Sequence, residues 1–406
     1  MKLKQISVIG LGYIGLPTAA VLAKNGYSVS GVDLDEHIVS TINDGKIHIV
    51  EPDLDKLVSS VVSSGHLKAY SEVQPSDVYM ICVPTPFHIG NAIPEPNIDF
   101  VLEATQAIIP LLKIGDMVIL ESTSPVGTTE KVGNLINEAG FSKDDIKIAY
   151  CPERVLPGKI VTELIENDRV IGGISPLSSK SVAKFYRTFV SGNVIESDSK
   201  TAEMCKLVEN SFRDVNIAFA NELSILCDKE GINVWNLIKL ANRHPRVNIL
   251  QPGTGVGGHC IAVDPWFIVS KDRENSKLIK MARKINNNKT DWVINKITSK
   301  ANELAEVLNR KPTIICLGVS FKADIDDLRE SPALGVVNSL LDKNFHVEVV
   351  EPNIEKHPNF KLVKLEEVLD NADLFVILVK HRQFNEQLIQ KKLMEKNVMD
   401  FCGALI

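Results

Sequence analysis

The sequence has little that would place the protein outside the cell or in a membrane. Its seven cysteines are scattered and none stands in a CxxC pair, which argues against a zinc site and a disulfide framework. No apolar stretch approaches the ~20 residues that span a bilayer. The basic start at residues 1–4 leads into an apolar run that breaks at Gly10 and Gly12, as in a strand entering a turn. We therefore expect a cytoplasmic protein with reduced thiols, no metal and no membrane contact.

The chain also lacks an excess of positive charge. Lys and Arg number 45 against 51 Asp and Glu, and the formal net charge is −6. This balance argues against a nucleic-acid partner. Hydrophobic residues make up 44% and charged residues 24%, which is ordinary for a soluble globular protein. At roughly 150 residues per domain, the 406 residues predict two or three domains.

Apolar strand patterns alternate with helical patterns at both ends of the chain. In the first part we expect strands at 5–9, 28–32, 78–83, 117–121 and 146–150. After Lys311 the same order returns, with strands expected at 313–319, 347–350, 374–379 and 398–401. Strands that alternate with helices predict parallel, doubly wound sheets.

The middle of the chain has a different pattern. Residues 201–230 contain no Pro or Gly and predict one long helix, which Gly231 ends as a C-terminal cap. A second long helix is expected at 276–308. The predicted fold is therefore α/β, with two Rossmann-like domains, 1–197 and 309–406, joined by a central helical domain at 198–308. Helices of this length are typical of dimer interfaces, so we expect a homodimer.

A dinucleotide-binding turn follows the first strand. Gly10 permits the tight turn, Gly12 lets the backbone approach a pyrophosphate, and Gly15 lets the next helix pack on the strand. Tyr13 and Ile14 complete the turn, and the helix after it offers N–H groups to phosphates. Asp33, at the end of the second strand, suits ribose hydroxyls and repels a ribose phosphate, which favours NAD over NADP. The alternative is a glycine turn without a cofactor.

Two further loops leave strand ends where a cofactor would lie. Thr85 and Thr123 stand in these loops, and their hydroxyls can hydrogen-bond to the nicotinamide half. The alternative is that both hydroxyls only stabilise turns.

A glycine-rich loop leads to Cys260. Four glycines within residues 253–258 let backbone approach a ligand closely and leave N–H groups for an anion. A cysteine at the end of such a loop is placed as a nucleophile, and Asp264 follows four residues later. The alternative is a buried inert cysteine, which is our interpretation of the other six.

The long helix supplies polar groups that can act with this cysteine. Lys206, Asn210 and Arg213 share one helical face. Lys206 and Asn210 can stabilise an oxyanion or hold a water. The alternative is a solvated polar face.

Five motifs resemble the UDP-glucose/GDP-mannose dehydrogenase family. In chain order they are GLGYIGLP, CPER at 151–154, AEMCKLVENSFR, GVGGHCIAVDPW and FKADIDDLRES. The resemblance covers the whole chain, and residues 242–266 are similar to the UDP-N-acetyl-D-mannosamine dehydrogenase branch. It implies that residues 1–197 bind NAD and that residues 309–406 bind a UDP-sugar.

The resemblance implies a four-electron oxidation with two NAD per turnover. Carbon six of UDP-N-acetyl-D-mannosamine becomes the carboxylate of UDP-N-acetyl-D-mannosaminuronate, in the context of polysaccharide synthesis. Cys260 forms a thiohemiacetal with the aldehyde and then a thioester, which water hydrolyses. The alternative substrates are UDP-N-acetylglucosamine and other nucleotide sugars.

The resemblance also assigns residue roles. The implied catalytic set is Cys260, Lys206, Asn210, Asp264 and Glu153, with Glu153 in the hydrolytic step. Thr123 and Arg329 are implied to contact the cofactor. The implied substrate contacts, besides Lys206 and Asn210, are Arg154, Val155, Arg213, His244, Arg246, Gly257, Phe321 and Lys322.

Two positions depart from the family pattern. Thr254 stands where this branch usually has proline, from which we expect a looser loop and unchanged chemistry. Cys402 stands where a basic residue near the substrate is expected.

Two other functions compete with this one. A two-electron enzyme of the hydroxyacid-dehydrogenase type would share the N-terminal domain and a catalytic lysine, but not the Cys260 loop or the third α/β block. A regulator that binds NAD or a nucleotide sugar without catalysis would carry Lys206, Asn210, Cys260 and Asp264 together by coincidence.

Overall fold

The structure is a computed structural model that describes residues 5–88, 90, 93–156 and 158–405; the basic residues 1–4 lie outside this range. Two compact units are found: Met1–Val208 with Trp266–Lys271, and Glu209–Pro265 with Asp272–Ile406. Each is described by itself, and the predicted division into three domains remains a prediction.

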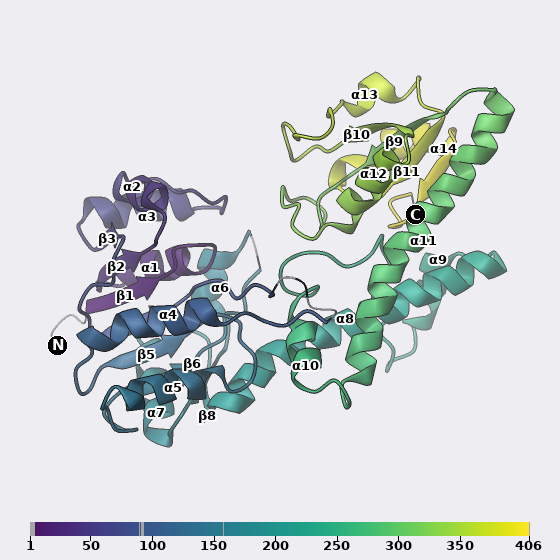
Figure 1. The fold of residues 1–406 in the computed structure, drawn as a ribbon. Helices are drawn as coiled ribbons and strands as arrows, with labels where there is room; N and C mark the ends of the chain where they lie inside the picture. The colour runs from purple at the N-terminus through teal and green to yellow at the C-terminus, as the bar shows by residue number, and fades with distance from the viewer. Residues whose placement is uncertain (1–4, 89, 91–92, 157, 406) are drawn as a thin grey trace. The chain divides into compact units, whose positions relative to one another are not determined.

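The first unit is built on an eight-stranded sheet (Figure 1). Its strands lie in the order β3 (Leu67–Tyr70), β2 (Ser28–Val32), β1 (Gln5–Ile9), β4 (Val78–Ile81), β5 (Met117–Leu120), β6 (Lys147–Tyr150), β7 (Arg169–Gly173) and β8 (Val194–Asp198). The chain moves outward from β1 to β3 and then returns to β4 on the other side of β1. This reversal creates a crevice at the carboxyl ends of β1 and β4, where such folds bind ligands.

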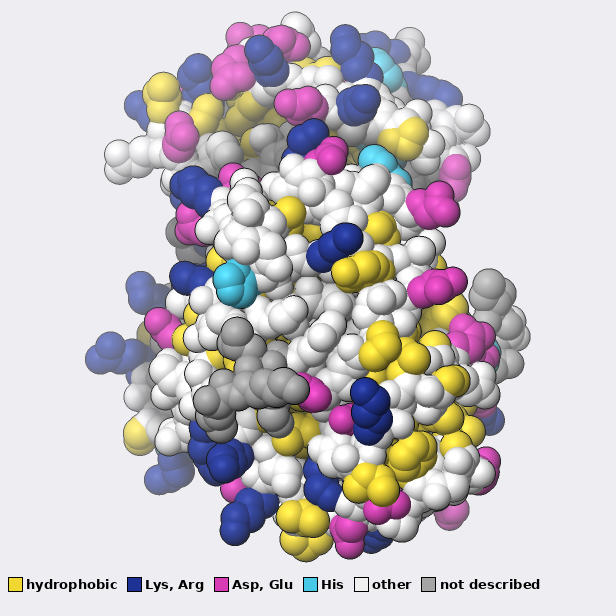
Figure 2. Space-filling model, turned by 90° about the vertical axis from the view of Figure 1, so that its left-hand side faces the viewer, with side chains coloured by type: hydrophobic (Ala, Val, Ile, Leu, Met, Phe, Trp, Pro, Cys, Tyr) yellow, Lys and Arg dark blue, Asp and Glu magenta, His cyan; other side chains and the backbone are white. Residues whose placement is uncertain are grey.

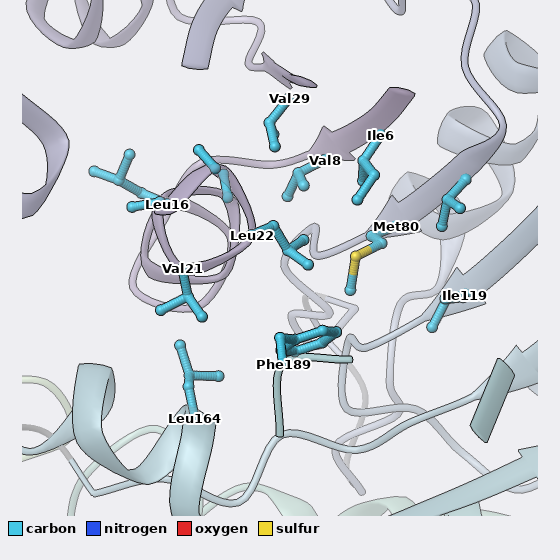
Figure 3. Close-up of a cluster of buried hydrophobic side chains, with 14 of the residues drawn as sticks. Ile6, Val8, Leu16, Val21, Leu22, Val29, Met80, Ile119, Leu164 and Phe189 are labelled. Atoms are coloured by element: carbon cyan, nitrogen blue, oxygen red, sulfur yellow. The ribbon is translucent and has the colours of Figure 1, made fainter. Parts of the chain in front are cut away.

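Helices cover both faces of this sheet. They are α1 (Gly15–Lys24), α2 (Glu36–Asn43), α3 (Leu54–Ser63), α4 (Asp99–Ile108), η1 (Ile109–Leu111), α5 (Thr128–Glu138), α6 (Ile160–Glu166) and α7 (Pro176–Tyr186). Side chains alternate along each strand, so each strand contributes to two cores. Ile6 and Val8 pack with α1, α3, α6 and α7, whereas Ile9 packs with α4 and α5. Figure 3 shows Leu22 of α1 in the first core, beside Val8 and Met80.

Two strands of this sheet, β7 and β8, run against the other six. β7 pairs antiparallel with β6, through Ala149 with Gly173 and Tyr150 with Gly172. The described pairings elsewhere in the sheet are parallel. The sequence predicted parallel strands but not β7 or β8. Apolar and polar residues alternate less clearly in these two strands. β8 is half-buried to exposed along its length.

The long predicted helix is α8 (Ser199–Glu230), and Gly231 follows it with φ +69°. Its first ten residues, Ser199–Val208, belong to the first unit. There the buried Glu203 carboxylate accepts hydrogen bonds from the backbone N–H groups of Gly127 and Thr129, over 2.6 and 2.7 Å, at the start of α5. A carboxylate suits this place because a helix N-terminus carries partial positive charge.

The rest of α8 belongs to the second unit, where it packs with α11 (Lys277–Leu308). The buried guanidinium of Arg283 pairs with the Asp214 carboxylate over 2.6 Å. Asn286 donates to the same carboxylate, and Asn221 donates to Asn286. This row of buried polar contacts fixes the register of the two helices. Two shorter helices are α9 (Val234–Ala241) and α10 (Asp264–Lys271), and α10 begins in this unit and continues into the first.

A four-stranded parallel sheet completes the second unit. Its order is β10 (His346–Val350), β9 (Thr313–Leu317), β11 (Leu374–Ile377) and β12 (Val398–Asp400). Val293, Ile297 and Ala301 of α11 pack on one face together with α12 (Pro332–Asp342). The other face is covered by α13 (Leu365–Val368), η2 (Arg382–Asn385) and α14 (Gln387–Met394). The α/β prediction with two Rossmann-like sheets and a helical middle is therefore confirmed.

The surface carries mixed charge. Figure 2 shows Lys and Arg interspersed with Asp and Glu over the face that it draws. Within the described ranges, no helix combines the length and the apolarity that a membrane span requires.

Candidate active site

The glycine turn after β1 has the geometry of a phosphate-binding turn. Gly10 has φ +89°, and a Cβ there would lie 2.8 Å from the carbonyl oxygen of Cys82. A Cβ on Gly15 would lie 1.7 Å from the carbonyl oxygen of Gly10. At Gly12, in contrast, a Cβ would meet no atom within 4 Å. Two glycines are therefore required by the fold, whereas Gly12 leaves open space beside the backbone.

The start of α1 fits an anionic group in that space. Its N-cap is Ile14, whose side chain cannot cap the first-turn N–H groups. Asp33 accepts a hydrogen bond from the backbone N–H of Leu11 over 2.9 Å, so its carboxylate lies beside the turn. The open space at Gly12, the uncapped helix and the adjacent carboxylate fit the pyrophosphate and ribose of NAD.

The two threonine loops touch each other. The Thr85 hydroxyl donates to the carbonyl oxygen of Thr123 over 2.7 Å. This bond joins the loops that follow β4 and β5. Thr85 therefore has a structural role whether or not it also contacts a cofactor.

Glu153 lies near Lys206 in the first unit. The Glu153 Oε1 atom is buried and has no hydrogen-bond partner among the described residues. Burial raises the pKa of this carboxyl to about 7, although the charges of Lys206 and Arg169 lower it. A carboxyl group that titrates near neutral pH is suited to accept a proton from water.

The Cys260 loop is packed against residues 321–332 of its own unit. A Cβ on Gly257 would lie 2.3 Å from the carbonyl oxygen of Glu330, and one on Gly258 would lie 2.8 Å from Cε2 of Phe321. The N–H of Gly258 donates to the carbonyl oxygen of Arg329 over 3.1 Å. The expectation that the loop's N–H groups are free is thus wrong at Gly258, because the loop uses that group to bind its neighbour.

Thr254 is also held in place. Its hydroxyl donates to the carbonyl oxygen of Leu378, and its own carbonyl accepts from the Thr290 hydroxyl over 3.0 Å. These bonds act against the looser loop that the sequence led us to expect.

Asp264 is the first residue of α10 and is buried. Its carboxylate accepts a hydrogen bond from the Asn210 side-chain amide over 2.5 Å, and its N–H donates to the Cys260 carbonyl oxygen over 2.8 Å. Three of the predicted catalytic residues are therefore connected within one unit. Lys206 lies one turn before Asn210 on α8.

Phe321 and Arg329 belong to one folded segment. The Phe321 N–H donates to the Asp327 carbonyl oxygen, and the Arg329 guanidinium pairs with the Asp327 carboxylate. Lys322 is exposed beside them. This segment supplies the surface on which the Cys260 loop packs.

The remaining predicted ligand residues lie near the surface. Arg213, His244 and Arg246 are exposed, and the Arg246 N–H donates to Nδ1 of His244 over 3.3 Å. Arg154 donates to the Asp168 carbonyl oxygen, and Val155 is partly buried against the first core. Exposed cationic side chains suit contacts to phosphate.

Burial raises the thiol pKa of three of the other cysteines. It raises the thiol pKa of Cys151 and of Cys316 to about 12 in each case, and that of Cys82 well above its usual value. These three remain thiols at neutral pH and act as small apolar side chains.

The chain matches the UDP-glucose/GDP-mannose dehydrogenase family over three segments. The NAD binding domain matches residues 4–190, the central domain residues 200–288, and the UDP binding domain residues 315–405. The chain belongs to this family. It is therefore an NAD-dependent dehydrogenase, in agreement with the fit of the glycine turn to NAD.

Relatives within the family are similar over their full length. The UDP-N-acetyl-D-mannosamine dehydrogenase of Campylobacter jejuni is 52% identical, over 99% of this chain and 100% of its own. The NDP-N-acetyl-D-galactosaminuronic acid dehydrogenase of Ralstonia nicotianae is 51% identical, over 98% and 96%. The structure of UDP-D-ManNAc dehydrogenase from Pyrococcus horikoshii is 38% identical, with a TM-score of 0.89 over 99% of this chain and 96% of that one.

Two buried charged residues of the first unit were missed by sequence reasoning. Glu203 anchors α8 at the start of α5, and Arg169 lies buried near Glu153. Arg169 gave little signal, because it follows Asn167 and Asp168 and only precedes the apolar residues of β7. Glu203 gave none, because an acidic residue on a helix is ordinary.

Proposed function

We propose that the protein oxidises UDP-N-acetyl-D-mannosamine at carbon six to UDP-N-acetyl-D-mannosaminuronate in two steps, through covalent intermediates on Cys260. The observation that carries this proposal is the connected set of Cys260, Asp264 and Asn210. A two-electron alcohol dehydrogenase needs acid–base groups but no nucleophile. An aldehyde must first gain a tetrahedral carbon before it can lose a hydride.

The roles of the chain's own groups follow from this chemistry. The Cys260 thiolate adds to the aldehyde carbon, and the oxygen of the resulting thiohemiacetal loses its proton as the thioester forms. Lys206 and Asn210 stabilise negative charge on that oxygen. Glu153 takes a proton from the water that attacks the thioester carbon, the carbon–sulfur bond breaks, and sulfur leaves as the Cys260 thiolate. Asp264 orients Asn210 by accepting its hydrogen bond.

NAD, when bound, would supply the hydride acceptor for each of the two oxidations at carbon six. The residues that we assign to it are Gly10, Gly12, Tyr13, Ile14, Gly15, Asp33, Thr85, Thr123 and Arg329. Asp33 supports NAD over NADP, because its carboxylate lies beside the turn.

Substrate contacts are assigned to two groups of residues. Phe321, Lys322 and Gly257 lie in the segment and loop that pack together in the second unit. Arg213, His244 and Arg246 supply exposed cationic or ring groups for the diphosphate and sugar. Arg154 and Val155 are assigned to the border of the sugar.

The nucleotide sugar is the finer part of the proposal. Relatives named for UDP-N-acetyl-D-mannosamine support that substrate, whereas the 51% identical Ralstonia relative is named for an N-acetyl-D-galactosaminuronic acid. The second candidate is therefore oxidation of UDP-N-acetylglucosamine or another nucleotide sugar by the same mechanism.

One assay separates these possibilities. NADH formed from UDP-N-acetyl-D-mannosamine, UDP-N-acetylglucosamine, UDP-glucose and GDP-mannose would be measured against sugar consumed. We expect about two NADH per UDP-N-acetyl-D-mannosamine and little from the others. One NADH with a released aldehyde would exclude the covalent mechanism, and NAD binding without NADH from any sugar would favour a regulator.

A homodimer through α8 belongs to the same proposal. Phe212, Phe219 and Leu226 recur every seven residues on this helix and are 71%, 55% and 55% exposed in the single chain. An apolar stripe of this spacing is a typical helix-pairing surface.

A further inference from the structure

Arg169 occupies an unusual position for a charged side chain. It is the first residue of β7 and is 1% exposed. Its Nη2 donates to the Leu164 carbonyl oxygen over 3.0 Å. Its Nε and Nη1 have no hydrogen-bond partner among the residues that the structure describes. Burial of a guanidinium with unmet donors is costly, and an apolar side chain of similar size is commonly as stable or more so. The charge therefore calls for a role beyond packing.

The groups around Arg169 are acidic. Its charge interacts with the Cys151 thiol, the Glu121 and Glu153 carboxyls and the Tyr186 hydroxyl. Glu121 follows β5, Cys151 and Glu153 follow β6, and Tyr186 ends α7. All of them belong to the first unit.

Glu121 is held in this group by hydrogen bonds. Its Oε1 accepts from the Tyr186 hydroxyl over 2.6 Å, and its Oε2 accepts from the Cys82 thiol over 3.4 Å. Its charge acts on the buried guanidinium of Arg169 and raises the pKa of Glu153.

The charges acting on Glu153 have opposite signs. Lys206 and Arg169 favour its ionised form, Glu121 disfavours it, and the thiols of Cys82 and Cys151 stay neutral because burial raises their pKa. Burial of the Glu153 carboxyl also disfavours ionisation. The ionisation of Glu153 therefore depends on a balance in which Arg169 and Glu121 act against each other.

We propose that Arg169 is a positioning residue for the hydrolytic step: its buried charge favours the ionised form of Glu153, in which this carboxylate can accept a proton from water, and the charge of Glu121 opposes that effect. The inference rests on the proposed role of Glu153. In the step that it supports, water oxygen bonds to the thioester carbon, one water proton passes to Glu153, and sulfur leaves as thiolate.

The test uses two substitutions that should act in opposite directions. The pH dependence of NADH production is measured in the full-length enzyme with Arg169→Met, Arg169→Lys and Glu121→Gln. Arg169→Met should move the acidic limb of the pH profile up by about one pH unit or more, and Arg169→Lys should restore most of the shift. Glu121→Gln should move the limb down. Arg187→Met removes an exposed charge from the end of α7 and should leave the limb unchanged.

A second readout does not depend on turnover. Infrared difference spectra against Glu153→Gln follow the ionisation of the Glu153 carboxyl directly, in each variant. A midpoint pH of the Glu153 titration that rises in Arg169→Met and falls in Glu121→Gln supports the inference. This holds even if no nucleotide sugar yields NADH and the proposed function fails. An unchanged midpoint pH in both variants overturns the inference. So does lower activity in Arg169→Met when the acidic limb of the pH profile does not move. If Arg169→Met does not fold, Glu121→Gln still decides the question.

Discussion

The side-chain amide of Asn210 and the carboxylate of Asp264 meet over 2.5 Å, although 54 residues separate them in the sequence. This bond connects α8 to the first residue of α10, directly after the turn that holds Cys260. A buried carboxylate needs such a donor, because ionised oxygens without partners are costly in the protein interior.

Asn210→Ala should therefore affect both stability and turnover. Loss of the donor to the buried Asp264 carboxylate should lower the free energy of unfolding by about 1–3 kcal/mol. Turnover should fall by about a hundredfold if Asn210 also stabilises the oxyanion. Asn216→Ala is the control, since Asn216 lies on the same helix and its amide donates to the Phe212 backbone. Equal effects of the two substitutions in urea unfolding and NADH assays would contradict the assignment.

The glycine turn allows cofactor binding to be separated from folding. Gly12→Ala adds a methyl group to open space, so the thermal midpoint should change little while the KM for NAD rises at least about tenfold. Gly15→Ala places a methyl group against the Gly10 carbonyl oxygen and should prevent stable folding. Thermal unfolding and NAD titration check both. An unchanged KM for NAD in Gly12→Ala would place the pyrophosphate elsewhere.

Gly258→Ala should destabilise the Cys260 loop. Gly258 has φ +82° and would press a Cβ against Phe321. Gly26 has nearly the same φ, +85°, and no atom within 4 Å, so Gly26→Ala reports the cost of the backbone conformation alone. That cost is about 1 kcal/mol, and Gly258→Ala should exceed it by about 1–3 kcal/mol. If urea unfolding shows equal losses of the free energy of unfolding in Gly258→Ala and Gly26→Ala, the Cys260 loop accommodates the methyl group without strain.

The raised pKa of Glu153 predicts how stability depends on pH. Its ordinary value is 4.5 and its value in the fold is about 7. Between these values the unfolded chain is ionised while the folded protein retains the proton, so rising pH favours unfolding. From about pH 4.5 to about pH 7 the free energy of unfolding of the wild type should fall relative to that of Glu153→Gln. Above about pH 7 the difference between the two should stay constant. Urea unfolding at a series of pH values measures this difference, and a flat difference would show that the pKa is not raised.

The ion pair between α8 and α11 should be far more important than a surface pair. Arg283→Met would leave the Asp214 carboxylate buried without its cation and should cost about 3–5 kcal/mol. Arg310→Met is the control, because Arg310 is exposed and pairs with Asp373 near the surface. Its loss should cost about 1 kcal/mol or less. Similar losses for the two variants would mean that the buried pair is not needed for helix packing.

The elements of the fold were predictable where periodicity was clear. The strands at 5–9 and 28–32 and the helix ending before Gly231 agree with the structure at these boundaries, because buried strands and long apolar helix faces leave strong patterns. β7 and β8 were missed. β7 has Arg169 at its start and two glycines at its end, so its apolar run is short, and β8 is half-buried to exposed.

The candidate site was predictable as a set of residues but not as a set of contacts. The motifs pointed to Cys260, Asp264 and Asn210 separately, whereas the bond between the last two depends on how distant segments pack. Glycines near Cys260 were interpreted as room for a ligand, yet Gly257 and Gly258 are also required by contacts with Phe321 and Glu330. Packing between segments 54 or more residues apart leaves no local pattern in the sequence.

The close fit between the Cys260 loop and residues 321–332 limits how this enzyme can be re-engineered. Exchanging residues 321–332 with those of a relative, in order to alter which nucleotide sugar is accepted, would change the surface against which Gly257 and Gly258 lie. A chimera that transplants only one of the two segments would displace Cys260 along with residues 321–332. Specificity exchanges should therefore move both segments as one cassette, and libraries should randomise them jointly.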